Sequence, residues 1–287
     1  MSIPPAYRLR PAGCAMLVIA FAACSTPAAH APVAPAPAPA PAPAGPGTAI
    51  GYLDAAAVPA SLQLLPPPPA AGTPGEALDL AVNREALALR GSPRWQQAAR
   101  DAALNFPAGA NQFACALGIA VDARRTPHLY TLLERSRVDA SATTRAAKKH
   151  YQRPRPFMLN LQPTCAPGDE DDLRRNGSYP SGHSTLGWTW ALILSEATPN
   201  RADALIARGR NYGESRLVCN VHWQSDVLAG RFMGAALVAR LHANPAFQAD
   251  LQAARGEIAR AQALGAAPQE DCATQTQVLK TRPASAL

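Results

Sequence analysis

Beyond its first 23 residues, the sequence has no apolar run long enough to cross a bilayer as a helix. Such a helix needs about 20 predominantly apolar residues. The longest later stretches, 186–194 and 228–238, are short or interrupted by Arg231. This pattern excludes a domain built from membrane-spanning helices.

The sequence also lacks the alternating Val, Ile and Thr runs that are typical of β-strands. From Glu76 onward, apolar residues recur at helical spacing instead, and Thr126 and Pro127 are typical of a helix start. We expect an all-α fold, with a single helical-bundle domain over 49–265 and a loose C-terminal tail over 266–287. Helices are expected from Pro127 onward and at 76–90, 94–104, 139–152, 182–196, 201–214, 221–241 and 246–263.

No CxxC spacing and no cluster of Asp, Glu and His suited to a metal site occurs in the chain. We therefore expect neither a bound metal nor another cofactor. Of the six cysteines, Cys14 lies in the N-terminal apolar run and Cys24 follows that run. The other four are even in number, which indicates one or two disulfides in an exported chain, with three pairings open. These disulfide candidates are Cys115, Cys165, Cys219 and Cys272.

Basic side chains are not gathered into a tract with interleaved aromatic residues, the pattern of a dedicated nucleic-acid binder. They do outnumber acidic ones, 27 to 20, and give a net charge of +7. This excess suits an anionic substrate or an anionic membrane surface. We expect no dedicated nucleic-acid binding.

The N-terminus has the layout of a secretory signal peptide over 1–23, with Arg8 and Arg10 before the short apolar run. The run ends in FAAC and resembles a bacterial lipoprotein signal, in which Cys24 would be lipidated, although Phe21 departs from the usual aliphatic residue. Simple cleavage into the periplasm is the alternative. Ser25 favours the outer membrane in that resemblance. Residues 24–48 are rich in Ala and Pro and predict an extended linker.

The first segment whose side chains could bind or react with a substrate is KKHYQRPRPF at 148–157. Pro154 and Pro156 flank Arg155 and favour extended backbone around it. A guanidinium presented in this way suits forked hydrogen bonds with phosphate oxygens, and Lys148 would add a point charge. The alternative is an ordinary solvated basic face.

The second segment, GSYPSGHS at 177–184, precedes an apolar helical pattern. Ser181 and Gly182 fall where that helix would begin, and the free N–H groups of a helix start attract anions. His183 would lie beside such an anion. The alternative is a serine helix cap with an incidental histidine.

The third segment is SRLVCNVHWQSD at 215–226. If its end is helical, His222 and Asp226 are four residues apart and share one face, so the carboxylate could hold the imidazole. Arg216 would add a further cation. The alternative is a buried core histidine beside a solvated acid.

Together, the three segments resemble one family. They reproduce the three-part signature of the type 2 phosphatidic acid phosphatase superfamily. Its first part is Lys148, six residues and Arg155-Pro156, and its second part is Pro180 to His183. Its third part is Ser215-Arg216, five residues, His222, three residues and Asp226. Within this superfamily, GSYPSGH, NVHWQSD and YLDAAAVPASLQLLPPPP at 52–69 look closest to the bacterial class A nonspecific acid phosphatases. The resemblance implies a helical phosphatase domain that begins near residue 50.

The resemblance also implies a division of roles. His222 would attack phosphorus and form a phosphohistidine, Asp226 would orient its ring, and His183 would protonate the leaving oxygen. Fixed cations would replace a metal, so we expect metal-independent hydrolysis of small phosphate monoesters with an acidic optimum. The phosphate-binding residues would be Lys148, Arg155, Ser181, Gly182 and Arg216.

Three other functions remain open from the sequence. A vanadium-dependent haloperoxidase would use the same anion pocket. A phosphatase for envelope lipids or lipopolysaccharide would suit a lipid anchor, which would be the only membrane contact. A noncatalytic phosphate-binding lipoprotein would not need His183, His222 and Asp226. A homo-oligomer is compatible with each of these functions.

Overall fold

The computed structural model describes residues 49–287. The expected signal peptide, Cys24 and the Ala/Pro-rich linker lie outside the described residues. Within them, the secondary structure is helical and contains no strand, which confirms the all-α prediction. The helices are α1 (Ser61–Leu64), α2 (Pro74–Leu87), α3 (Pro93–Ala102), α4 (Ala108–Asn111), α5 (Ala114–Leu117), α6 (Pro127–Tyr151), α7 (Pro156–Asn160), η1 (Pro167–Asp169), α8 (Glu170–Arg174), α9 (Gly182–Ala197), η2 (Pro199–Arg201), α10 (Ala202–Val218), α11 (Gln224–Leu241), α12 (Pro245–Ala263) and α13 (Cys272–Val278).

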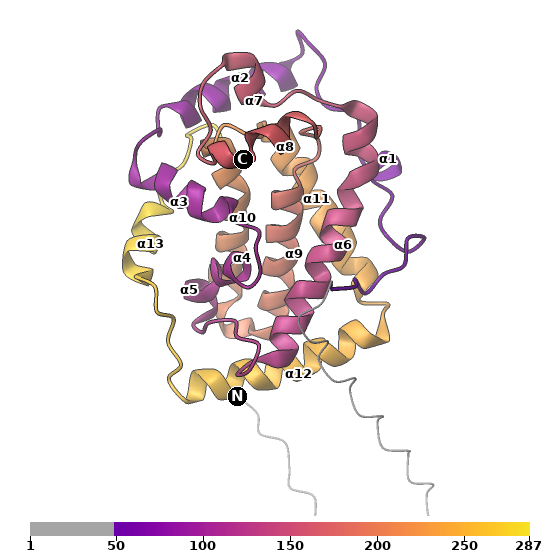
Figure 1. Cartoon of the computed structure of the whole chain (residues 1–287), viewed down its shortest axis with the longest axis vertical. Coiled ribbons are helices and arrows are strands. Elements are labelled where there is room, and N and C mark those ends of the chain that lie inside the picture. Colours follow the sequence, from indigo (N-terminus) through magenta and orange to yellow (C-terminus); the bar gives the residue numbers. More distant parts are fainter. Residues whose placement is uncertain (1–48) are drawn as a thin grey trace, which may run out of the picture. The chain divides into compact units, whose positions relative to one another are not determined.

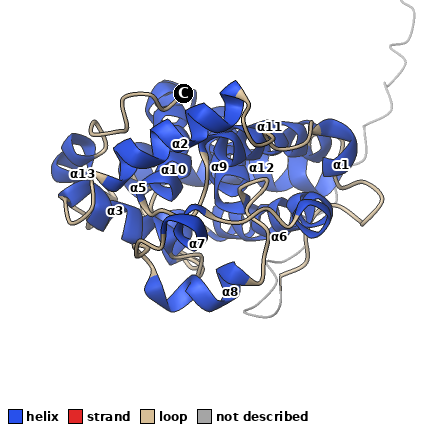
Figure 2. Cartoon of the chain, turned by 90° about the horizontal axis from the view of Figure 1, so that it is seen from above, coloured by secondary structure: helices blue, strands red, loops and turns tan. Residues whose placement is uncertain are grey.

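Helix α9 is the centre of the bundle. Helices α6, α10 and α11 pack around it, and α12 runs across one end of the bundle (Figures 1 and 2). The sequence of α9 is apolar around most of the helix circumference, as expected of a helix enclosed by others. Leu186, Trp190, Ile193 and Leu194 are all buried in the main hydrophobic cluster. The residues just before α9 are therefore held by the core of the fold.

Two glycines allow the neighbouring helices to approach α9 closely. A Cβ atom at Gly209 of α10 would lie 2.4 Å from the Cβ of Ala191, and one at Gly230 of α11 would lie 2.6 Å from the carbonyl oxygen of Ser181. Any side chain at these positions would force the helices apart. Gly230 thus brings α11 against the beginning of α9, where two of the sequence segments meet.

Some helix boundaries differ from the prediction. The helix predicted to start at Pro127 and the one predicted over 139–152 form one continuous helix, α6, with no break between them. The helix predicted over 221–241 begins only at Gln224, because α10 ends at Val218 and Asn220 adopts a left-handed backbone conformation with φ of 63°. None of the described helices is long and apolar enough to span a bilayer.

Two disulfides link distant parts of the described chain. Cys115 pairs with Cys272, and Cys165 pairs with Cys219. Both close long loops, 157 and 54 residues apart in sequence, and cross-links of this kind typically contribute about 2–4 kcal/mol by restricting the unfolded chain. All four candidate cysteines are therefore paired.

The C-terminal segment 266–287 is not the loose tail that we expected. It contains α13, is joined to α5 by the Cys115–Cys272 disulfide, and runs back along the bundle. The carbonyl oxygen of Thr281 accepts a hydrogen bond from Arg94 at 3.1 Å, and Ser285 donates its backbone N–H to Glu85 at 2.8 Å. The polar composition was misleading because these residues are held by hydrogen bonds rather than by an apolar face.

Candidate active site

The beginning of α9 is built by Ser181 and Gly182. Ser181 is the helix cap, and its hydroxyl oxygen accepts the backbone N–H of Ser184 at 3.2 Å. The Ser181 backbone N–H donates to the carbonyl oxygen of Asp226 at 2.9 Å, so α9 and α11 start side by side. This N–H is consequently occupied, contrary to the expectation that it is free for phosphate. Gly182 lines the adjacent cavity.

Lys148 reaches this cavity from the last turn of α6. Its Nζ donates to the carbonyl oxygens of Gly177 at 2.7 Å and Ser178 at 3.4 Å, which fixes the side chain across the segment that leads into α9. Burial, together with the charge of Arg155, lowers the pKa of Lys148 to about 7. A nearby anion would restore its positive charge.

Arg155 is 2 % exposed and caps α7 with extended backbone, as the flanking prolines predict. Its Nε donates to the carbonyl oxygen of Leu173 at 2.9 Å, while Nη1 lies 3.0 Å from both the carbonyl oxygen of Val221 and Nε2 of His222. Burial and the charge of Arg216 lower the pKa of Arg155 to about 10. The guanidinium stays charged at neutral pH and contacts the histidine directly.

The contacts of His222 define its tautomer. A guanidinium can only donate, so Nε2 of His222 accepts from Arg155. Nδ1 then carries the proton and donates to Oδ2 of Asp226 at 3.2 Å. Asp226 Oδ2 also accepts the backbone N–H of Trp223 at 2.9 Å. The lone pair of Nε2 is thereby directed toward the cationic end of the cavity.

The pair does not lie on one helix face, as the sequence had predicted. His222 belongs to the connection between α10 and α11, and Asp226 lies in the first turn of α11 and reaches back to it. The spacing of four residues is therefore used across a helix start. A carboxylate there also gains from the partial positive charge of the helix N-terminus.

His183 lies in the first turn of α9 and lines the same cavity as His222. Its Nε2 is 3.0 Å from the carbonyl oxygen of Ala102, so Nε2 carries a proton and Nδ1 is left for other partners. Burial lowers the pKa of His183 well below its usual range, and the charge of Arg216 is the second cause of this shift. The hydrogen bond to the Ala102 carbonyl oxygen opposes it. Burial and the charge of Arg155 lower the pKa of His222 in the same way.

Arg216 is fully buried in the last turn of α10, yet none of its three guanidinium nitrogens has a hydrogen-bond partner among the described residues. Burial lowers its pKa. It lines a cavity that shares His183 with the cavity of Lys148 and His222. An unpaired buried guanidinium is costly, and an anion beside it would remove that cost.

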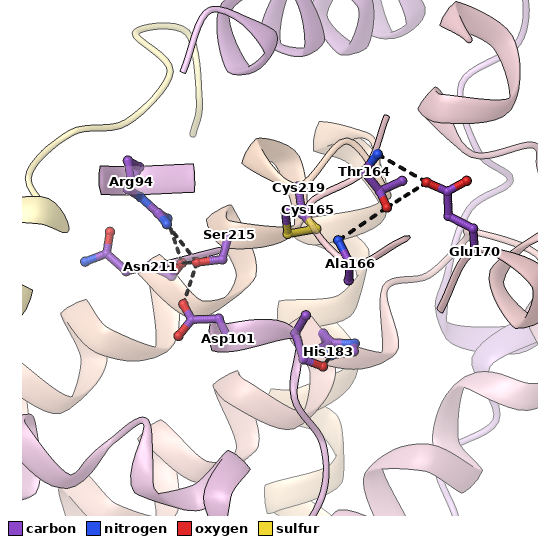
Figure 3. The surroundings of a disulfide bond; sticks show 11 residues. Arg94, Asp101, Thr164, Cys165, Ala166, Glu170, His183, Asn211, Ser215 and Cys219 are labelled. Carbon is purple, nitrogen blue, oxygen red and sulfur yellow. Dashed lines mark hydrogen bonds between the residues drawn. A yellow bond between two sulfur atoms is a disulfide. The ribbon is translucent and has the colours of Figure 1, made fainter. Parts of the chain in front are cut away.

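The neighbouring Ser215 is held by hydrogen bonds to α3. Its hydroxyl donates to Asp101 at 2.5 Å and accepts from Arg94 at 2.9 Å, and both partners belong to α3 (Figure 3). The Cys165–Cys219 disulfide fixes the end of α10 to the loop before α8 in the same region. The segment that carries Arg216 is therefore held on two sides.

Comparison with known proteins agrees with this arrangement. The PAP2 superfamily matches residues 136–248, which include all three segments. The non-specific acid phosphatases of Salmonella typhimurium and Providencia stuartii are 45% and 43% identical to the chain over 195 and 210 residues. These alignments cover 68% and 73% of this chain and 78% and 85% of the relatives. The chain belongs to the class A non-specific acid phosphatases of the PAP2 superfamily. An acid phosphatase of Zymomonas mobilis is 39% identical over 209 residues, 73% of this chain and 79% of that protein.

The phosphatase has a further buried charge network that the sequence reading missed. Arg153 contacts Asp226 Oδ1 at 2.6 Å and Asp79 at 2.8 Å. Asp79, from α2, also accepts the backbone N–H and the hydroxyl of Ser225, at 2.7 and 2.6 Å. Arg153 was visible in the basic segment between Lys148 and Arg155, but its partner Asp79 is 74 residues away. The network holds Oδ1 of Asp226, while Oδ2 is held by His222 and the backbone N–H of Trp223.

We expect Arg153→Gln to lower kcat by about 10- to 100-fold, as is common for residues that orient a reactive group through another side chain. Loss of its charge also raises the pKa of His222, because Arg153 lowers that pKa in the intact protein. Steady-state kinetics should therefore show the acid limb of kcat/KM moved to higher pH. Arg125→Gln removes an exposed, ion-paired arginine as a control. An Arg153→Gln enzyme with lower activity but an unmoved acid limb would indicate a purely structural role.

The lowered pKa of His183 predicts how activity depends on pH. The resemblance to the family implies that His183 protonates the leaving oxygen, and the protonated fraction of His183 falls as pH rises above its depressed pKa. We expect log kcat/KM to fall with a slope near –1 between about pH 6.5 and 8. His183→Asn should abolish this limb; if the limb persists in the variant, it comes from the substrate phosphate or from Lys148, whose pKa is about 7.

Proposed function

We propose that this acid phosphatase hydrolyses small phosphate monoesters through a phosphohistidine at His222, without a metal ion. The observation that carries the proposal is the tautomer of His222, in which Nδ1–H faces Asp226 and the Nε2 lone pair faces Arg155. Asp226 thus keeps Nε2 as the unprotonated, nucleophilic nitrogen, and Arg155 exchanges its hydrogen bond to Nε2 for one to a phosphate oxygen when the ester binds. The names of the relatives support the phosphatase activity but do not extend to the intermediate.

In the first step, Nε2 of His222 attacks phosphorus and the bond from phosphorus to the ester oxygen breaks. His183 gives that oxygen a proton, carried on Nδ1 because Nε2 is bonded to Ala102. Asp226 stabilises the positive charge that develops on the phosphorylated ring. In the second step, neutral His183 takes a proton from water as the water attacks phosphorus and His222 leaves.

Charge on the transferring phosphoryl group would be stabilised by fixed cations. Lys148 and Arg155 line the cavity beside His222, and Arg216 lines the adjoining cavity together with His183, with no hydrogen-bond partner for its guanidinium nitrogens among residues 49–287. Such prearranged charges act most strongly where water is excluded. Among residues 49–287, no group of three or more His, Cys, Asp or Glu side chains could hold a metal ion.

The test is phosphate release from an aryl phosphate by the full chain at pH 5–6, with and without excess EDTA. Equal rates with and without the chelator support the proposal, and loss of activity that Zn²⁺ or Mg²⁺ restores would refute metal independence. If the folded protein releases no phosphate, vanadate-supported bromide oxidation distinguishes the haloperoxidase alternative. Binding of phosphate without either reaction would leave the noncatalytic alternative.

We also propose that the chain is exported and held in the periplasm by lipid on Cys24. The two disulfides support an oxidising compartment, since structural disulfides persist there. Labelling with a radioactive fatty acid, in parallel with Cys24→Ala, tests the anchor. Label that remains in Cys24→Ala, or no label in the parent protein, would argue against lipid on Cys24.

A further inference from the structure

The cavity at His222 carries more positive charge than one phosphate needs. It has a volume of about 550 Å³, and its lining includes six Lys or Arg residues and no Asp or Glu. Lys148 and Arg155 belong to the family signature. The other four cations do not: Arg137, Arg145, Lys149 and Arg175.

Two of these additional cations, Arg137 and Arg145, lie on one face of α6 together with Lys148. Arg137, Ser141, Arg145 and Lys148 recur at steps of three or four residues and all line the cavity. At a rise of about 1.5 Å per residue, Arg145 lies about 4–5 Å from Lys148 along the helix axis and Arg137 about 16 Å away. The positive charge thus extends from the phosphate end along the helix.

The additional α6 charges are not neutralised by the described residues. Arg137, Arg145 and Lys149 take part in none of the ion pairs among residues 49–287, and the buried Nε of Arg137 has no hydrogen-bond partner. Arg175 differs, because it pairs with Asp172. Unpaired like charges along one cavity repel each other, and an anionic ligand would relieve that repulsion.

Part of the cavity lining is apolar and could contact the carbon chain of a ligand. Leu104, from the loop after α3, and Leu186, from α9, line the same cavity as the α6 cations. Leu104 remains 39 % exposed, so it has apolar surface left to cover. A ligand with an anion at each end and carbon between them would match this distribution of charge and apolar surface.

We propose that Arg137 and Arg145 form an outer anion subsite, which selects phosphomonoesters whose alcohol part carries a second phosphate group. The proposal rests on the proposed function, because it places the scissile phosphate at Lys148, Arg155 and His222. The second phosphate then binds further along α6. Hydrogen bonds from charged donors to phosphate favour such substrates over equally long ones that end in carbon.

The experiment compares hexane-1,6-diol bisphosphate with hexyl phosphate, which differ only in the second phosphate. We expect kcat/KM for the bisphosphate to be about 10- to 100-fold higher at low salt, beyond the factor of about two for its two equivalent ends. Arg137→Gln/Arg145→Gln should reduce this ratio to about two, mainly through KM for the bisphosphate. Arg124→Gln/Arg125→Gln, which removes the same charge from exposed positions outside the cavity, should retain the high ratio.

The outcomes separate this inference from the proposed function. A parent ratio near two, or a high ratio that the α6 double variant retains, overturns the outer subsite while hydrolysis continues. A ratio that falls equally in both double variants shows attraction by net charge and also overturns it. If the parent hydrolyses neither these esters nor an aryl phosphate, the proposed function fails. The ratio of the two dissociation constants, measured calorimetrically on the parent and both variants, then decides whether the subsite exists.

Discussion

Replacing His222 by alanine is expected to lower kcat for aryl phosphate hydrolysis by about 10⁴-fold or more. Covalent catalysis has no substitute when its nucleophile is removed, and the remaining cations can only bind the ester. The measurement is initial-rate phosphate release at saturating substrate. His150→Ala provides a matched control, because His150 is an exposed histidine near the end of α6 that does not line the cavity.

The intermediate gives this prediction a second readout. A phosphate on a histidine nitrogen survives alkaline quenching and is lost in acid, whereas a phosphoserine behaves in the opposite way. Rapid alkaline quenching of the parent should therefore trap labelled protein, and His222→Ala should trap none. An acid-stable label that persists in His222→Ala would indicate that a hydroxyl is the nucleophile, and Ser181 of the signature would be the first residue to test.

The parts of the site that could be predicted from sequence are local ones. Ser181 caps α9, Arg155 has extended backbone between two prolines, and α6 begins at Pro127. Each outcome depends on backbone preferences of a few adjacent residues. The segments could therefore be assigned to helix starts and connections before their mutual arrangement was known.

The placement of His222 and Asp226 could not be predicted from the residues between them. A spacing of four residues fits one helix face, but it also fits a carboxylate in a first helical turn that reaches back beyond the start. The choice depends on Asn220, whose left-handed conformation turns the chain, and on its contacts with Asn83 and Asn160 at about 3 Å. Those partners are far away in sequence, so helical spacing alone could not identify the turn.

The same limit applies to Arg153 and to the C-terminal segment. Arg153 looked like one more charge in a basic run, and only the fold brings Asp79 of α2 against it. The polar segment after residue 265 looked unable to pack, yet Arg94 and Glu85 bind it through its backbone and Ser285. In both cases the decisive contact joins residues that no short window contains.

Replacing Arg216 by methionine should separate stability from function. The guanidinium is fully buried and its three nitrogens have no hydrogen-bond partner in the described part of the chain, so without a bound anion its desolvation cost is not relieved. A methionine of similar size removes that cost, and apolar replacement of buried charges can stabilise a protein by about 1–4 kcal/mol. We expect the melting temperature to rise by several degrees, at about 2–4 °C per kcal/mol, and kcat/KM to fall about 10³-fold.

The stabilisation of the protein by inorganic phosphate tests whether Arg216 binds the anion. At about 100 times its dissociation constant, phosphate should stabilise the parent by about 2.7 kcal/mol, and most of this gain should be absent from Arg216→Met because the buried cation no longer attracts the ion. Arg240→Met, at an exposed position of α11, should keep the full gain. A less stable Arg216→Met protein with an undiminished response to phosphate would mean that Arg216 supports the fold rather than the anion. A more stable protein that no longer responds would mean that this buried charge is retained for phosphate.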